Sequence, residues 1–198
     1  MCIRDRFTDR LERAMSYQAA ELLAADLVVH ASSPISDERE ARARSLGLDT
    51  ARTATFRSVV VHDDAFQLVE AKAVSEGYPL RGRLGIADAA FGEARPADSG
   101  PARGSAWVDA RLAATLGVSV GDTLEVGKKR LRISGIVAYE PDRAGDLFSI
   151  APRLMFHLDD LAQTDLVQPA SRVRYRLLVG GNADSVAAFR ETVEADPR

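Results

Sequence analysis

The sequence has 198 residues, of which 46% are apolar and 28% are charged, and its formal net charge is −3. These are ordinary globular values for a chain long enough to bury a core, as one large domain or two small ones. The acidic balance excludes a basic footprint for nucleic acid, and the single cysteine, Cys2, excludes a disulfide framework.

The first residues indicate an extraneous leader followed by a helix. Met1–Arg6 (MCIRDR) lacks the apolar core of a signal peptide, and we interpret it as a non-native leader. Phe7, Leu11, Met15 and Leu22 recur every three or four residues, which predicts an amphipathic helix over Thr8–Ala25. No stretch approaches the ~18–20 apolar residues of a membrane span.

The next segment predicts a strand and a charged helix. Leu27–Ala31 is typical of a buried strand, interrupted by His30. Ser36 is placed to cap a helix over Asp37–Leu46, in which acids precede arginines as the helix dipole favours, and Gly47 ends it. This order indicates a layer of helices on a sheet.

From Thr50 the pattern changes to a hairpin. Thr53–Val61 and Phe66–Val74 are rich in β-branched and apolar residues, and Asp63–Asp64 between them is a turn signal. Lys72 falls in the second strand, and Leu84–Ile86 is a further short strand. The glycines, prolines and acids of residues 91–103 predict a flexible loop joining two subdomains.

Residues 104–137 predict a compact unit of one helix and a hairpin. The expected elements are strand Ala106–Val108, helix Asp109–Leu116 capped by Asp109 and ended by Gly117, and strands Thr123–Val126 and Arg130–Val137 around a turn at Gly127–Lys129. A helix of two turns must bury its apolar face to be stable. We therefore expect one small core, made of Leu112, Leu116, Leu124, Ile133 and Val137.

The last third alternates loops, strands and helices. The pattern predicts a loop at Pro141–Asp146, a strand at Arg153–His157, a short helix at Leu158–Gln163, a strand at Arg172–Val179 and a helix at Asp184–Ala195. Arg172, Arg174 and Arg176 lie on one face of their strand. This arginine row is either a solvated sheet face, which we favour, or a site for anionic head groups or carboxylates.

These elements predict an α+β fold with two subdomains. Residues 7–90 and 139–198 would form a mixed sheet layered with helices, cut short at its C-terminal end. Residues 104–138 would form an inserted helix-plus-hairpin subdomain.

Three motifs suggest chemistry. Gly117–Gly121 is a G-x-S-x-G sequence centred on Ser119, with Asp142 and His157 downstream, but a nucleophile elbow needs a strand before the serine and a helix after it, the reverse of the order here. Gly121 and Gly127 are one residue too far apart for a phosphate loop, and Lys129 stands where Ser or Thr should hold magnesium, so ATP binding by this route is excluded.

The histidines give the third motif. His30, His62 and His157 lie far apart, and although two of them precede acidic pairs, none has the paired spacing of a zinc site. We therefore expect no catalytic, cofactor-binding or metal-binding residues and no cofactor.

A resemblance also extends over most of the chain. Its pattern is carried by Val108, Asp109, Leu112, Ala113, Leu116, Gly117, Val118, Gly121, Asp122 and Gly135, together with the stretches Lys72–Gly82 and Pro152–Gly181. These residues resemble the MacB-like periplasmic core domain of FtsX-like and MacB-like ABC transporter permeases, in particular the YbbP-like branch of predicted permeases.

The resemblance implies a non-catalytic domain on the periplasmic side of a bacterial inner membrane. It implies a fragment cut from between two membrane spans, a separate ABC ATPase subunit as partner, and a dimeric or pseudo-symmetric transporter. The domain would relay ATPase-driven motion to a periplasmic partner protein or to a lipid-like or hydrophobic substrate. Two alternatives stay open: a small serine hydrolase using Ser119, Asp142 and His157, and a ligand-binding module with a groove between its subdomains.

Overall fold

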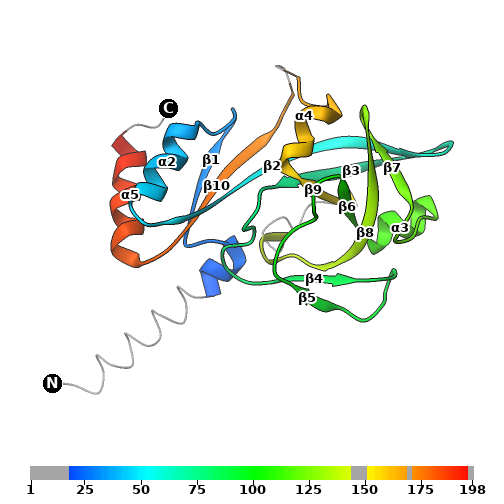
Figure 1. Ribbon diagram of the computed structural model, residues 1–198, viewed down its shortest axis with the longest axis horizontal. Coiled ribbons are helices and arrows are strands. Elements are labelled where there is room, and N and C mark those ends of the chain that lie inside the picture. Colours follow the sequence, from blue (N-terminus) through cyan, green and yellow to red (C-terminus); the bar gives the residue numbers. More distant parts are fainter. Residues whose placement is uncertain (1–17, 144–150, 169–170, 196–198) are drawn as a thin grey trace.

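The computed structural model describes residues 18–143, 151–168 and 171–195. They form one ten-stranded sheet in the order β1-β10-β2-β3-β9-β6-β8-β4-β5, with β7 beside β2 and β8 (Figure 1). The strands are β1 (Leu27–Ala31), β2 (Asp49–His62), β3 (Ala65–Val74), β4 (Leu84–Ala87), β5 (Arg95–Ala97), β6 (Ser105–Asp109), β7 (Thr123–Val126), β8 (Lys129–Tyr139), β9 (Arg153–His157) and β10 (Arg174–Gly180). Pairs β3–β9 and β6–β8 are parallel and the others antiparallel, so the predicted α+β fold with a mixed sheet is confirmed.

Helices pack on this sheet at both of its ends. They are α2 (Asp37–Ser45), α3 (Ala110–Leu116), α4 (Leu161–Thr164) and α5 (Ala183–Ala195), with 3-10 turns η1 (Pro141–Arg143) and η2 (Leu158–Asp160). Figure 1 shows α2 and α5 side by side at the left end, where Ala43 and Phe189 share a core with Leu177. Residues 18–23 form a further helical segment, which ends two residues before the expected end at Ala25 because Ala24 takes a φ of 58°. Residues 8–17 of the helix expected over Thr8–Ala25, like the leader at Met1–Arg6, lie outside the described residues.

The predicted hairpin is confirmed and is longer than expected. Strands β2 and β3 pair from Thr53↔Val74 to His62↔Ala65 and reach the right end of the molecule in Figure 1. Asp63 takes the left-handed conformation (φ 50°) in the connecting turn, which Asp tolerates better than most residues. Strand β2 begins at Asp49 because its first residues pair with β10, a partner distant in sequence.

Both helix caps expected from the sequence are present. The Ser36 side chain accepts a hydrogen bond from the Arg39 N–H, and the Asp109 side chain accepts one from the Leu112 N–H. Gly117 ends α3 with a φ of 68°.

Strand alternation gives the sheet two chemically different faces. Ala71 of β3 and Leu154 of β9 belong to the largest apolar core, under α3 and α4. Their strand neighbours Lys72 and Arg153 point to the opposite face, where they are buried beside a second apolar cluster that contains Met155. Charged side chains of several strands are thereby brought together on that second face.

Three local expectations are corrected. The loop expected over residues 91–103 contains β5, which pairs with β4 through Leu84↔Ala97. Strand β1 is an edge strand in which only Val29 is buried and His30 is exposed, so it is not the buried strand that its apolar residues predict. The arginine-row strand starts at Arg174 rather than at Arg172.

The small core expected in residues 104–137 is correct except for Val137. Leu112, Leu116, Leu124 and Ile133 share one cluster, whereas Val137 belongs to the cluster on the other face. The cause is a bulge, because Ala106↔Ile133 is followed by Trp107↔Gly135 and one residue of β8 is skipped. The extra residue reverses which face the rest of β8 presents.

The division into two subdomains stays a prediction. Strands β6 and β8 of the segment 104–138 lie within the common sheet, between β9 and β4.

Candidate functional site

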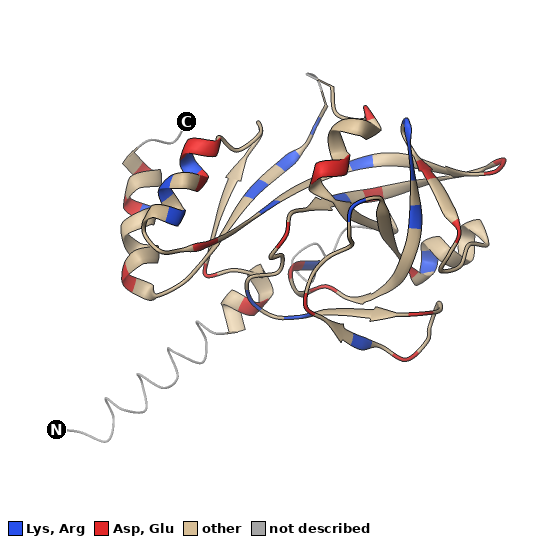
Figure 2. Ribbon diagram, viewed as in Figure 1, with Lys and Arg blue, Asp and Glu red and all other residues tan. Residues whose placement is uncertain are grey.

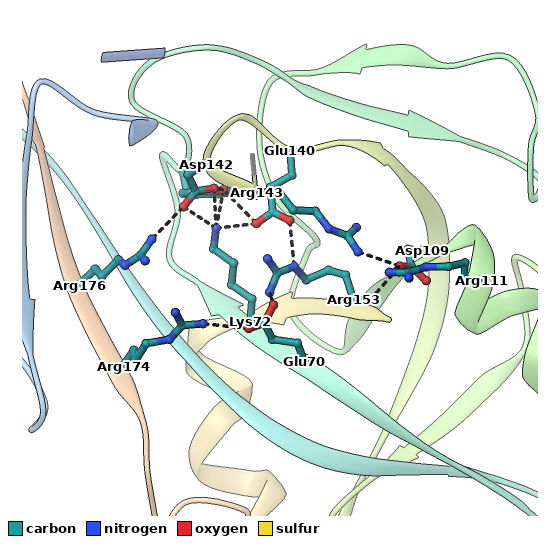
Figure 3. Close-up of polar contacts among 11 residues, drawn as sticks. Glu70, Lys72, Asp109, Arg111, Glu140, Asp142, Arg143, Arg153, Arg174 and Arg176 are labelled. Atoms are coloured by element: carbon teal, nitrogen blue, oxygen red, sulfur yellow. Dashed lines mark hydrogen bonds and ion pairs between the residues drawn. The ribbon is translucent and has the colours of Figure 1, made fainter. Parts of the chain in front are cut away.

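Lys72 is the centre of a buried ionic network on the second face of the sheet (Figure 3). Its side chain is 2% exposed, and its Nζ lies 2.6 Å from Glu140 Oε1 and 2.8 Å from each carboxylate oxygen of Asp142. Nζ also donates to the Tyr78 hydroxyl at 2.6 Å. A buried ammonium ion is tolerated only with such partners, because its desolvation costs several kcal/mol.

Glu140 bridges Lys72 to Arg153. While Oε1 accepts from Lys72, Oε2 accepts from Arg153 Nε at 2.9 Å. Burial by itself would raise the pKa of Glu140, but the charges of Lys72 and Arg153 outweigh it and lower that pKa from 4.5 to about 2. Glu140 is therefore ionised at neutral pH although it is buried.

Glu70 extends the network to the arginine row on β10. Glu70 and Arg153 are register partners in the parallel pair β3–β9, and Arg153 Nη1 lies 2.8 Å from Glu70 Oε2. The other oxygen, Oε1, accepts from Arg174 Nη2 at 2.8 Å. One carboxylate thus joins β3, β9 and β10.

Tyr78 and Asp142 close the other side of the network. The Tyr78 hydroxyl donates to Asp142 Oδ1, and Lys72 Nζ lies 4.3 Å from the centre of the Tyr78 ring. Burial, followed by the negative charges of Glu140 and Asp142, raises the pKa of Tyr78 well above 10. The phenol therefore keeps its proton and acts as a donor. Arg176 Nη1 reaches Asp142 Oδ2 at 3.4 Å.

Asp109 connects α3 to the same region. Besides capping α3, its carboxylate accepts from the Arg153 backbone N–H at 3.1 Å and from Arg143 Nη2 at 2.9 Å. Burial opposes ionisation, but the Leu112 N–H and these other donors lower the pKa of Asp109. The start of α3 is therefore fastened to β9 and to η1.

A pocket of about 240 Å³ opens beside the network, toward the helical residues 18–23. Its charged lining comes from Lys72, Asp142, Arg153, Arg174 and Arg176. Figure 2 shows the basic positions along β10 beside those of β2.

Paired charges of this kind suit a rigid joint. Each carboxylate named above accepts hydrogen bonds from at least two donors. Together these bonds join strands β3, β6, β9 and β10 to η1. Breaking a buried pair by removing one partner is costly, so such a network resists separation of the elements that it joins. In the sequence, the signal was a lysine inside an apolar strand, with a glutamate two residues before it.

The three residues of the hydrolase alternative, Ser119, Asp142 and His157, lie in separate environments. Ser119 is exposed in a turn, where its N–H donates to the Asp122 carboxylate. Asp142 bonds Lys72 and Tyr78, and His157 Nδ1 accepts from the Asp159 N–H as the cap of η2.

The residues that the sequence suggested for metal or phosphate binding make local contacts instead. His62 Nδ1 lies 3.0 Å from the Thr123 carbonyl oxygen. Lys128 and Lys129, at the tip of the β7–β8 hairpin, pair with Asp165 and Asp160. Within the described residues, no group of three or more His, Cys, Asp or Glu side chains is placed to hold a metal ion.

The fold is shared with solved structures, including the following two. The extracellular domain of the noncanonic ABC-type transporter YknZ from Gram-positive bacteria superposes with a TM-score of 0.53 and 10% identity, over 82% of this chain and 88% of that one. The periplasmic region of MacB from Actinobacillus actinomycetemcomitans gives a TM-score of 0.52 and 11% identity, over 85% of this chain and 81% of that one. At these identities the likeness defines the fold alone. No protein-family model matches the chain.

As expected from the sequence, the chain resembles the extracytoplasmic domains of MacB-like and YknZ-like ABC transporter permeases. In sequence it is similar to the uncharacterized ABC transporter permease YbbP of Escherichia coli (strain K12), with 35% identity over 184 residues and 93% of this chain. The chain spans 22% of the length of that relative. These comparisons confirm the resemblance expected from the sequence and support a non-catalytic permease domain rather than the hydrolase alternative.

No helix in the part of the chain that the structure describes is long and apolar enough to cross a membrane.

Proposed function

We propose that this chain is the periplasmic domain of an inner-membrane ABC permease. It relays ATPase-driven motion to a substrate or partner outside the inner membrane. The observation that carries the proposal is the similarity to the permease YbbP over nearly the whole chain. A separate ABC ATPase is the energy source in this proposal, because Gly121 and Gly127 are spaced wrongly for a phosphate loop and the chain does not bind ATP by that route.

The architecture supports a relay. Strand β2 runs from the α2 and α5 end of the sheet to the opposite tip of the molecule, where the chain turns back into β3 (Figure 1). The network around Lys72 fastens β3 to β9, to β10 and to the end of β8. Motion applied at one end is therefore carried by a stiff sheet to the other end, where a periplasmic partner protein or a second permease copy would receive it.

The substrate class that we propose is lipid-like or hydrophobic. Two exposed apolar side chains support it: Leu22 is 53% exposed on the helical segment 18–23, and Phe66 is 77% exposed near the tip of the β2–β3 hairpin. Exposed large apolar residues on a domain are suited to contact apolar ligands or partners.

The test is Leu116→Ala in the intact transporter, reconstituted with its ATPase in liposomes. Leu116 packs α3 against the sheet core, so the substitution weakens the relay without touching the membrane part. We expect outward movement of Nile red to fall several-fold while ATP hydrolysis continues. Val120→Ala, at an exposed position in the same segment, should leave both unchanged. Normal dye movement in a Leu116→Ala transporter whose domain is shown by proteolysis to be unfolded would exclude the relay.

A further inference from the structure

The pocket beside the ionic network has an excess of positive charge. Lys72, Arg153, Arg174 and Arg176 line it together with a single carboxylate, that of Asp142. Among the described residues, Glu70 and Glu140 also pair with members of this group. A concave surface of this kind attracts anions, since low-dielectric walls focus the field of its charges.

One lining arginine is incompletely satisfied. Arg176 meets Asp142 only at 3.4 Å through Nη1, and its buried Nε lacks a hydrogen-bond partner among the described residues. A buried donor without a partner is uncommon and costly, so Arg176 Nε at this pocket is consistent with a site completed by a polar ligand.

The opposite wall of the pocket is apolar. Leu22 and Leu23 of the helical segment line it together with Val28 of β1. Leu22 is 53% exposed and Leu23 is 46% exposed, so both present apolar surface to solvent at the rim. A ligand with an anionic group and an apolar chain would cover both surfaces at once.

We propose that this pocket binds the head group of a single-chain anionic amphiphile. Its carboxylate or phosphate oxygens accept from Arg174 and Arg176, and the first carbons of its chain lie against Leu22 and Leu23. At about 240 Å³, the pocket is smaller than the ~300–1,000 Å³ of most ligand sites, so it holds a head group with a few carbons and leaves the rest of the chain outside. The inference rests on the proposed function, because it names the kind of hydrophobic molecule that the domain meets.

His30 provides supporting evidence for the positive potential. It lines the same pocket opposite Arg176, its register partner in β10. Partial burial, followed by the charges of Arg176 and Arg174, lowers the pKa of His30. The imidazole is therefore neutral at pH 7 and can donate one further hydrogen bond to an oxyanion.

The test is calorimetric titration of the 198-residue chain with dodecyl phosphate and with laurate, both below their micellar concentrations. Inorganic phosphate and neutral dodecyl maltoside are titrated in parallel. We expect both anionic amphiphiles to bind at least about tenfold more tightly than inorganic phosphate or the maltoside, and the stronger of the two identifies the preferred oxyanion. Equal affinity for inorganic phosphate would mean that the site takes a free anion, and it would overturn the proposal.

Variants separate the two halves of the site. Arg174→Gln with Arg176→Gln should weaken dodecyl phosphate binding by at least about tenfold. Arg172→Gln is the matched control, since that arginine belongs to the same row but does not line the pocket. Leu22→Gln, at an exposed position, should weaken dodecyl phosphate but not inorganic phosphate, and it tests the site even if the double variant fails to fold.

Unchanged binding in folded variants, or tighter binding of a glutamate-rich peptide than of the amphiphiles, would overturn the proposal. These titrations use the chain without its transporter. If the amphiphiles do not bind, the pocket proposal fails but the relay proposal does not. If the amphiphiles bind but the transport assay excludes the relay, the pocket is a binding site with no role in transport.

Discussion

Lys72 and Glu140 lie 68 positions apart in the chain, yet their side chains meet at 2.6 Å with almost no exposure to solvent. Lys72 is in the hairpin strand β3, whereas Glu140 directly follows β8, the last strand of the segment that the sequence predicts as a separate unit. Their contact therefore joins that segment to the longest hairpin of the sheet. A domain that transmits motion needs such a connection, because two loosely attached units would move independently.

Replacing Lys72 with Met should destabilise the chain by about 3–5 kcal/mol, since Glu140 and Asp142 would then be left as buried, under-compensated charges. The measurement is urea denaturation followed by circular dichroism. Arg130→Gln, which breaks an exposed pair with Glu125, is the control and should cost less than about 1 kcal/mol. Equal costs for the two substitutions would show that the network contributes no more than a surface pair.

Acid should weaken the fold in a specific pH range. Because the pKa of Glu140 is depressed from 4.5 to about 2 in the folded state, its contribution is fully present above pH 4.5 and is lost as the pH falls toward 2. The unfolding free energy measured between pH 7 and pH 2 should therefore decline mainly below pH 4.5. In Glu140→Gln the decline over that range should be smaller, and a curve as steep as that of the parent chain would assign the acid sensitivity to other carboxylates.

The features that the sequence predicted are those decided within a few residues. Ser36 and Asp109 cap their helices through an N–H three positions ahead, and Gly117 ends α3 because it tolerates a positive φ. The hairpin turn at Asp63 is similarly local. Such signals need no knowledge of the rest of the fold.

The features that the sequence did not predict depend on distant partners. Residues 95–97 are a strand only because β4 provides an edge for them, and their composition is that of a loop. The bulge opposite Trp107 places Ile136 on the face of Ile133 and moves Val137 to the other face. Because Ile136 and Val137 are both apolar, the sequence does not indicate which of them faces that core. The network and its pocket were likewise hidden, since Lys72, Glu140 and Arg153 are far apart in sequence and only the sheet order brings them together.

Because the bulge in β8 places Ile133 and Val137 on opposite faces, it predicts which core substitutions are energetically coupled. Leu112→Ala should cost about 2–5 kcal/mol, because the side chain is fully buried. Combined with Ile133→Ala, in the same cluster, it should show a coupling energy of at least about 0.5 kcal/mol. Combined with Val137→Ala, on the other face, the effects should add within about 0.5 kcal/mol. Double-mutant cycles in urea measure both, and strong coupling to Val137 with none to Ile133 would contradict the observed register.

Gly127, at the tip of the β7–β8 hairpin, and Gly104, just before β6, allow a matched pair of alanine substitutions. Gly127 and Gly104 have similar positive φ values, 60° and 75°, so alanine at either position carries the same backbone cost of about 1–2 kcal/mol. Their surroundings differ, because a Cβ at Gly127 would lie 2.1 Å from the Thr164 carbonyl oxygen, whereas one at Gly104 would meet nothing within 4 Å. That same oxygen accepts from the Lys128 N–H at 2.8 Å, so alanine at 127 must push α4 away and break this bond.

Gly127→Ala should therefore destabilise the chain clearly more than Gly104→Ala, by at least about 1 kcal/mol beyond the shared backbone cost, since the backbone hydrogen bond from Lys128 to Thr164 is lost as well. Urea denaturation gives the two free energies of unfolding. Hydrogen exchange at the Lys128 amide gives the local effect, and the exchange should accelerate only in Gly127→Ala. If both variants lose the same stability and the Lys128 amide stays protected in each, the hairpin tip does not pack on α4, and the ion pairs of Lys128 and Lys129 are surface contacts without a structural role.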